Sequence, residues 1–198
     1  TNLTKLNYKK DDILELWNHF KAVKLFISID GVYDTYNYIR QLADFETVKQ
    51  NIKKVNKHPK VIYIAGACTL QIYNIFHLPQ ITDGFIEELD IDVHTHRVNY
   101  PKFLDCRVIP ANLKAELVEQ FKDYIQTIQN KTHANWTEER KRNAVSHIKD
   151  AINMLQGGDM PEQIESFIEF SDKLDAKQKV KKTWRELLPK LAKEIDGN

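Results

Sequence analysis

The sequence predicts an α/β fold in which a parallel sheet is followed by a set of C-terminal helices. Residues 1–129 alternate between helical spacings of apolar residues and short apolar runs typical of strands, and residues 130–198 carry helical spacings alone. We therefore expect an α/β domain at 1–129 and a helical extension at 130–198 that packs on it. Three strands are expected in the sheet, which is too few to close a barrel.

Each strand–helix unit of the first domain is identified by the spacing of its apolar residues. A helix is expected where they recur every three or four residues, and a strand where they form a short run ended by a turn residue. The expected strands are 24–29, 61–70 and 91–98. The expected helices are 11–21, 45–57, 79–89 and 111–128. Because helices separate the strands, the strands should run parallel and present functional groups at their C-terminal ends.

The C-terminal extension is expected to contain three helices, each with an apolar stripe that needs a partner. These helices are 137–155, 161–174 and 180–195. Gly157 and Gly158 separate the first two. No linker rich in Pro, Gly or Ser precedes them, so we expect them to pack against the α/β domain.

Composition excludes several classes of protein. The 29 Lys and Arg residues are balanced by 28 Asp and Glu residues, a formal net charge of +1, so nucleic acid is not favoured as a partner. Without a run of about 18 apolar residues or a secretory signal, we expect no membrane partner and a cytoplasmic location. Cys68 and Cys106 are too far apart for a paired-ligand motif and make no disulfide framework.

Several short segments recur, in the same order, in radical S-adenosylmethionine enzymes. In the α/β domain they are Ile27-Ser28-Ile29-Asp30-Gly31, Tyr38-Ile39-Arg40, Phe45-Glu46-Thr47-Val48, the stretch from Thr69 to Pro79, and Asn99-Tyr100-Pro101. In the tail they are Phe167-Ile168-Glu169-Phe170, Lys173-Leu174-Asp175 and Trp184-Arg185-Glu186-Leu187. Over nearly its whole length the chain resembles the twitch-domain radical S-adenosylmethionine proteins. The resemblance implies a partial parallel (β/α) barrel of which residues 1–129 are the C-terminal half.

The resemblance also implies two cofactors for the full-length parent, S-adenosylmethionine and a 4Fe-4S cluster. The C-x-x-x-C-x-x-C loop that holds this cluster in the family is absent from the 198 residues. Cys68 and Cys106 do not replace three closely spaced thiolates, so this chain is not expected to bind the cluster. We therefore expect a fragment, inactive alone, whose partners are the missing N-terminal half of the barrel and an unknown substrate. The alternative is a non-catalytic binding or assembly protein built on the half-barrel.

Ser28, Asp30 and Arg40 are the first candidate cofactor-binding residues. Ser28 and Asp30 lie two apart at the end of a strand and should face the same side, with Gly31 allowing a turn after them. In the resembled family this strand end lies beside the ribose and carboxylate of the cofactor. A hydroxyl and a carboxylate suit the ribose and ammonium groups, and a guanidinium suits the methionine carboxylate. The alternatives are a simple turn at Asp30-Gly31 and a solvated surface arginine.

Thr69, Gln71 and Asn74 are the second group of candidate cofactor-binding residues. They fall at or just after the end of the second expected strand, where uncharged amides and a hydroxyl can meet adenine or substrate. The alternative for Asn74 is to cap the short helix that follows or to hold a loop.

His94, His96 and Asn99 are expected to face the substrate, because the resembled family places polar groups of the barrel interior at these positions. An H-x-H pair on a strand projects both imidazoles from one face. The alternative is a metal-dependent hydrolase in which His94 and His96 bind zinc or iron. Its third ligand would come from Asp90, Asp92 or His77. No motif fixes that third ligand, and we assign no metal ligand.

Overall fold

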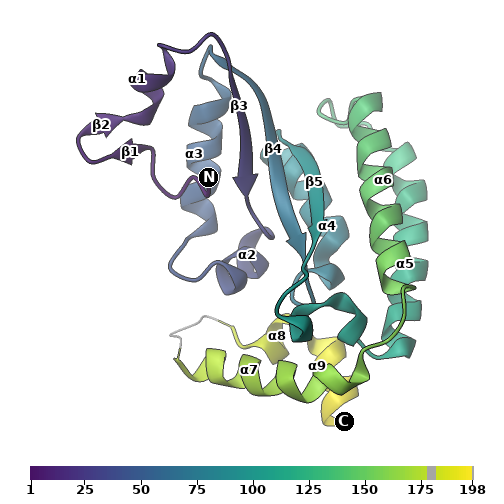
Figure 1. Ribbon diagram of the computed structural model, residues 1–198. Helices are drawn as coiled ribbons and strands as arrows, with labels where there is room; N and C mark the ends of the chain where they lie inside the picture. The colour runs from purple at the N-terminus through teal and green to yellow at the C-terminus, as the bar shows by residue number, and fades with distance from the viewer. Residues whose placement is uncertain (178–181, 198) are drawn as a thin grey trace.

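A three-stranded parallel sheet forms the centre of the computed structural model, which describes residues 1–177 and 182–197. Its strands lie in the order β3, β4, β5 (Figure 1). They are β3 (Val23–Ser28), β4 (Val61–Leu70) and β5 (Asp92–Arg97). The predicted α/β class and the three parallel strands are confirmed. Within the described residues, no helix is both long and apolar enough to cross a membrane.

Helices connect the strands of the sheet, as the spacing of apolar residues predicts. Between β3 and β4 lie α2 (Tyr33–Ile39) and α3 (Phe45–Asn56). Between β4 and β5 lie the 3-10 turn η1 (Ile75–His77), α4 (Leu78–Asp83) and the π-helical turn η2 (Gly84–Glu88). After β5 come the 3-10 turns η3 (Lys102–Leu104) and η4 (Cys106–Val108), and then α5 (Ala111–Gln129). Helix α2 was not predicted from the sequence.

The two faces of the sheet differ in what covers them. Ile27, Gly66 and Val93 form a buried row across one face, and Phe85 packs so closely on Gly66 that an added Cβ would lie 2.5 Å from its ring. Phe26 lies on the other face and is 52% exposed. Parallel sheets are ordinarily buried on both faces, so the face that carries Phe26 is unusually open.

The C-terminal helices pack along one side and under one end of this sheet (Figure 1). They are α6 (Glu138–Leu155), the 3-10 turn η5 (Pro161–Gln163), α7 (Ile164–Lys177), α8 (Trp184–Leu187) and α9 (Pro189–Asp196). Helix α6 lies against α5 and β5, whereas α7, α8 and α9 lie below the C-terminal ends of the strands. Their apolar residues join the core of the α/β part, as the burial of Phe167 and Trp184 at 0% exposure shows.

The last helix predicted from sequence, 180–195, is two helices over its described part. Thr183 begins α8 with a capping box shared with Glu186. Leu188 then leaves the helical conformation because the following Pro189 disfavours it, and α9 starts at that proline. Residues 180 and 181 of the predicted helix lie outside the described residues.

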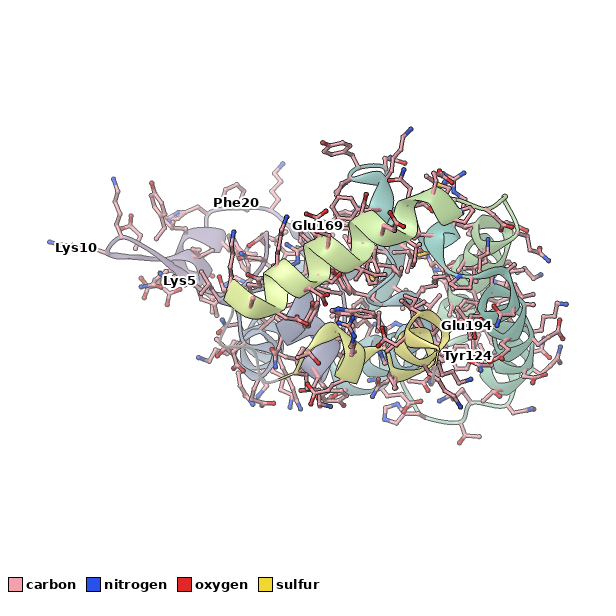
Figure 2. All side chains as sticks on the ribbon, turned by 90° about the horizontal axis from the view of Figure 1, so that it is seen from below. Lys5, Lys10, Phe20, Tyr124, Glu169 and Glu194 are labelled. Carbon is pink, nitrogen blue, oxygen red and sulfur yellow. The ribbon has the colours of Figure 1, made fainter. Side chains whose placement is uncertain are left out.

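The N-terminal segment forms a small arm that extends away from the sheet. It consists of β1 (Asn7–Tyr8), β2 (Asp11–Asp12) and α1 (Ile13–Trp17). Figure 2 shows Lys5, Lys10 and Phe20 on this arm. The predicted helix 11–21 is longer than α1, because its first residues pair in the β-hairpin and its last apolar residue, Phe20, is exposed rather than packed.

Candidate functional site

Asp30 is the centre of a polar cluster at the C-terminal edge of the sheet. It follows β3 by two residues and is only 4% exposed. Its Oδ2 accepts a hydrogen bond from Arg40 Nε at 2.6 Å, and its Oδ1 accepts one from the Thr69 backbone N–H at 2.8 Å. One carboxylate therefore joins the segment after β3, the helix α2 that follows it, and the end of β4.

Asn74 completes the link between the two strand ends. Its side chain is fully buried, and its Nδ2 donates to the carbonyl oxygens of Asp30 and Thr69, each at 2.9 Å. Its Oδ1 accepts from the Gln71 backbone N–H at 2.9 Å. It does not use its side chain to cap η1, so the loop-holding role is the one that the structure shows. Gln71 is itself 7% exposed.

Helix α2 brings Arg40 back to the strand end. Gly31 permits this close approach for a steric reason, because a Cβ there would lie 2.9 Å from both Thr35 Cγ2 and the Tyr36 nitrogen, and Gly31 has no positive φ. Arg40 ends the helix and donates its backbone N–H to the Tyr36 carbonyl oxygen at 2.8 Å. Its side chain is 33% exposed, so the guanidinium is anchored by Asp30 on one edge and reaches solvent on another.

Ser28 lies on the open face of the sheet with His94 and His96. In one row across the sheet, Ser28 pairs with Ala67 and Ala67 pairs with His94. In the next row on the same face, Thr69 pairs with His96. The His94 and His96 rings stand 4.7 Å apart between centroids. Four of the predicted site residues thus share one face of the sheet.

Asn99 is exposed on the segment that follows β5. Its position keeps it near the C-terminal edge, two residues after Arg97 ends the strand.

His147 of α6 joins the two histidines of β5. Its ring centroid lies 5.5 Å from that of His94, and its Nδ1 lies 3.0 Å from Thr95 Oγ1. Burial, followed by the nearby His94 ring, lowers the pKa of His147 below its ordinary value. His147 could not be identified from the sequence, because a single histidine on an amphipathic helix gives no signal of what the helix packs against.

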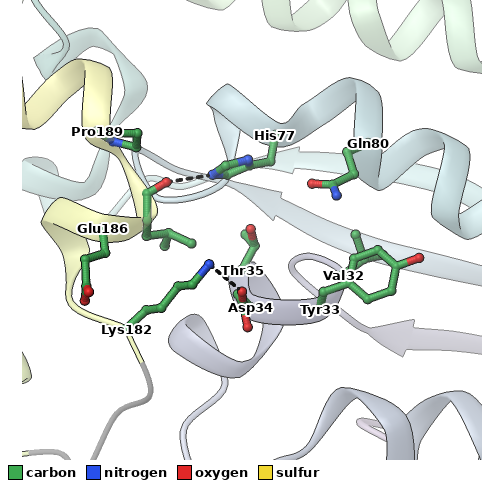
Figure 3. Close-up of a pocket in the computed structure, with 10 residues that line it drawn as sticks. Val32, Tyr33, Asp34, Thr35, His77, Gln80, Lys182, Glu186 and Pro189 are labelled. Atoms are coloured by element: carbon green, nitrogen blue, oxygen red, sulfur yellow. Dashed lines mark hydrogen bonds and ion pairs between the residues drawn. The ribbon is translucent and has the colours of Figure 1, made fainter.

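The other residues weighed as metal ligands are used elsewhere. Asp90 and Asp92 each form an ion pair with Arg140 at 2.7 Å. His77 Nε2 lies 3.1 Å from the Leu187 carbonyl oxygen of the C-terminal segment (Figure 3). In the described part of the chain, no three His, Cys, Asp or Glu residues are placed to hold a metal ion together.

Both cysteines are fully buried, and burial raises the pKa of each thiol well above its ordinary value. Metal ligation needs the thiolate, and reactivity needs it too. Cys68 and Cys106 therefore behave as small apolar core residues rather than as ligands.

The C-terminal helices are tied to the loops that follow the strands. Tyr38 Oη donates to Asp175 Oδ1 at 2.8 Å, and Tyr73 Oη lies 2.6 Å from Ser171 Oγ. Burial raises the pKa of Tyr73 to about 12, so this phenol stays protonated at neutral pH. These contacts fix α7 beneath the loops that carry the polar cluster.

A cavity of about 290 Å³ lies where the last helices meet α2 and α4 (Figure 3). Lys182 spans it to form a 2.7 Å ion pair with Asp34, and His77 contacts the Leu187 carbonyl across it. The two bridges join the C-terminal segment to α2 and to η1, the first helical elements after β3 and β4. The cavity is thus a space left between these segments, and the Lys182–Asp34 ion pair bridges it.

Comparison of the chain with known protein families, with curated proteins and with solved structures finds no match.

Proposed function

We propose that this chain is the C-terminal part of a radical S-adenosylmethionine enzyme and supplies the residues that hold the polar half of that cofactor. The observation that supports this function is the convergence of Asp30, Arg40, Thr69 and Asn74 at the C-terminal edge of the parallel sheet. Ligands of parallel α/β folds bind at this edge. The same residues carry the resemblance in the sequence, although they are separated by up to 44 positions.

The open face of the sheet supports the proposal that these strands belong to a partial barrel. Barrel strands turn one face inward, and the inward positions here are those of Phe26, Ser28, His94 and His96. Three strands leave this face only partly covered: Phe26 is 52% exposed, although Ala65 beside it is buried. Further strands are needed to enclose it.

The free edge of β3 already pairs with one residue in the manner of a parallel strand. The terminal ammonium group of Thr1 donates an N–H to the Phe26 carbonyl oxygen at 3.3 Å, and the Thr1 carbonyl oxygen accepts from the Ser28 N–H at 2.7 Å. In a parallel ladder, one residue bonds in this way to the residues on either side of its partner. We propose that the N-terminal half of the barrel adds its strands at this edge and is therefore the chain's main partner.

The polar cluster is suited to hold the amino acid end of S-adenosylmethionine. The exposed edge of the Arg40 guanidinium can pair with the carboxylate through charge-assisted hydrogen bonds, while Asp30 keeps its Nε in place. Ser28, the last residue of β3 and two residues before Asp30, offers its hydroxyl to the ribose. Asn74 and Gln71 contribute indirectly, by fixing the loop after β4. Thr69 contributes by donating its backbone N–H to Asp30, which keeps that carboxylate in place.

The described residues do not fit an iron–sulfur cluster. The two thiols are buried and protonated, and no group of three possible ligands is formed in the parts of the chain that the structure describes. In the full-length enzyme, such a cluster would supply the reductive cleavage of S-adenosylmethionine that starts radical chemistry on a substrate. The cluster would have to be held by the other half of the barrel, so this chain's own task is to bind and orient the cofactor.

Calorimetric titration of the 198-residue chain with S-adenosylmethionine tests this function. Arg40→Ala should weaken binding by about 10-fold or more, because it removes a charge-assisted pair, and Arg40→Lys should recover part of it. Glu46→Ala, on the exposed side of α3, is the matched control and should bind as the parent does. Thermal melting confirms that each variant is folded. A folded parent chain without measurable affinity would favour the alternative, a non-catalytic binding protein.

A further inference from the structure

Two arginines share one buried carboxylate at the end of β5. Asp105 accepts from Arg97 Nε at 3.2 Å and Nη2 at 2.8 Å. It also accepts from Arg107 Nε and Nη2, both at 3.1 Å, and from the Arg107 backbone N–H at 2.9 Å. Burial opposes ionisation of Asp105, but the hydrogen bonds from both arginines outweigh it and hold its pKa below the usual value. The carboxylate is therefore charged at neutral pH.

This arginine cluster, Arg97, Asp105 and Arg107, lies at the same edge of the sheet as the candidate cofactor site. Arg97 is the last residue of β5 and pairs with Leu70, the last residue of β4. The Ile72 N–H donates to the Leu104 carbonyl at 2.9 Å, which places Asp105 beside the loop that begins with Gln71. The cluster thus follows β5 as the Asp30–Arg40 pair follows β3.

The cluster carries one more positive than negative charge, and its positive side faces solvent. The side chains of Arg97 and Arg107 are 40% and 27% exposed, whereas that of Asp105 is 6% exposed. Each guanidinium donates from Nε and Nη2 to Asp105. Its Nη1 side does not contact this carboxylate and can donate to another acceptor. Among the described residues, Asp105 is the one carboxylate within ion-pair distance of either arginine.

We propose that Arg97 and Arg107 bind an oxyanion of the substrate, a carboxylate or a phosphate group. A guanidinium whose side edge is held by a buried carboxylate is pre-oriented, so its outer N–H groups can bind an anion at little cost in side-chain entropy. The inference rests on the proposed function in one respect: it takes the anion to belong to the molecule that lies beside the cofactor. The anion site itself stands on the arginine cluster alone.

Titrations of the 198-residue chain with inorganic phosphate and with succinate test the site and separate the two anion types. Nε–H signals of the arginines are followed by ¹⁵N NMR, and affinities are taken from the shifts. Arg97→Gln and Arg107→Gln should each weaken binding of the preferred anion by about 10-fold or more. Arg107→Lys should retain part of the affinity, because it keeps the charge. Lys102→Gln, an exposed cation on the same loop, is the control and should change nothing.

Two results would overturn the inference. One is a parent chain whose Arg97 and Arg107 signals do not shift with either anion up to about 10 mM, well above a millimolar dissociation constant. The other is unchanged affinity in both glutamine variants. The parent titration needs no variant, so it decides the matter even if a substitution prevents folding. S-adenosylmethionine titrations of the same samples report on Arg40 separately, and either proposal can fail without the other.

Discussion

The Nδ2 atom of Asn74 lies 2.9 Å from the carbonyl oxygen of Asp30, and so one amide joins the segments that follow two neighbouring strands. The same side chain also bonds to Thr69 and Gln71. The bonds to Asp30 and Gln71 are buried and the bond to Thr69 is partly buried, and an unpaired polar group at such positions is costly. Asn74 therefore determines the shape of the loop on which the candidate site depends.

Replacing Asn74 with alanine should destabilise the chain by about 2–3 kcal/mol, because the buried backbone groups of Asp30 and Gln71 and the partly buried carbonyl of Thr69 lose its hydrogen bonds. Urea unfolding followed by circular dichroism gives the change in free energy. Asn99→Ala, an exposed asparagine at the same edge of the sheet, should stay within about 0.5 kcal/mol of the parent. Equal effects of the two substitutions would contradict the role given to Asn74.

Asp30→Ala should cost about 2 kcal/mol of stability, since it removes the acceptor of one charge-assisted bond and leaves the Thr69 N–H unpaired. Arg40→Ala should cost less, because Arg40 is one third exposed and Thr69 keeps its acceptor. Urea unfolding gives the loss of free energy of unfolding in each variant, and the loss should be larger for Asp30→Ala. A larger loss for Arg40→Ala would show that the carboxylate is not the centre of the cluster.

Protonation of His147 should lower the free energy of unfolding of the chain at acid pH. Its pKa in the folded protein lies below the ordinary value of 6.5, first because of burial and then because of His94. The unfolded chain therefore takes up this proton more readily, and stability that is fully present above pH 6.5 is lost as the pH falls towards the folded pKa.

Replacing His147 with glutamine should make the free energy of unfolding less dependent on pH between about 7.5 and 5.5. Urea unfolding at several pH values measures this dependence. His19→Gln, at an exposed position of the N-terminal arm, is the matched control and should leave the dependence unchanged. A parallel shift of the curve for the His147 variant, with its slope intact, would refute the assignment.

The open face of the sheet should drive self-association of the isolated chain. Phe26 is 52% exposed there, and Phe26→Lys should reduce association by adding charge to the face. Leu42→Lys removes another exposed apolar side chain, on the loop between α2 and α3, and should have little effect. Sedimentation velocity at increasing concentration compares the variants. A monomeric parent chain would indicate that this face needs no cover.

The sheet could be predicted from sequence because its signals are local. Residues 61–70 are apolar and β-branched in one run and form β4 over the same range. Helix α2 was missed because its buried residues include Thr35, Tyr36 and Tyr38, which do not stand out as an apolar stripe. The short α1 was overestimated because apolar spacing does not report whether a partner surface exists.

The candidate site was only partly predictable for a related reason. Asp30 and Arg40 were grouped by the resemblance and by the chemistry of their side chains, but the link from Asp30 to Thr69 depends on the register of two strands. The contact of His147 with Thr95, and the sharing of Asp105 by two arginines, depend on how separate elements pack. Arg97 did carry a signal, since it directly follows the His94-x-His96 pattern, whereas Arg107 carried none.

The most direct test of the cofactor site is a ¹⁵N NMR titration of the 198-residue chain with S-adenosylmethionine. We expect the Arg40 Nε–H signal and the backbone amide signals of Thr69 and Gln71 to shift, because these groups surround the Asp30 carboxylate. The Nε–H signal of Arg142, exposed on α6, should not move. If the Arg40, Thr69 and Gln71 signals stay in place up to about 1 mM cofactor, the chain does not hold S-adenosylmethionine at this edge and the proposed function is wrong.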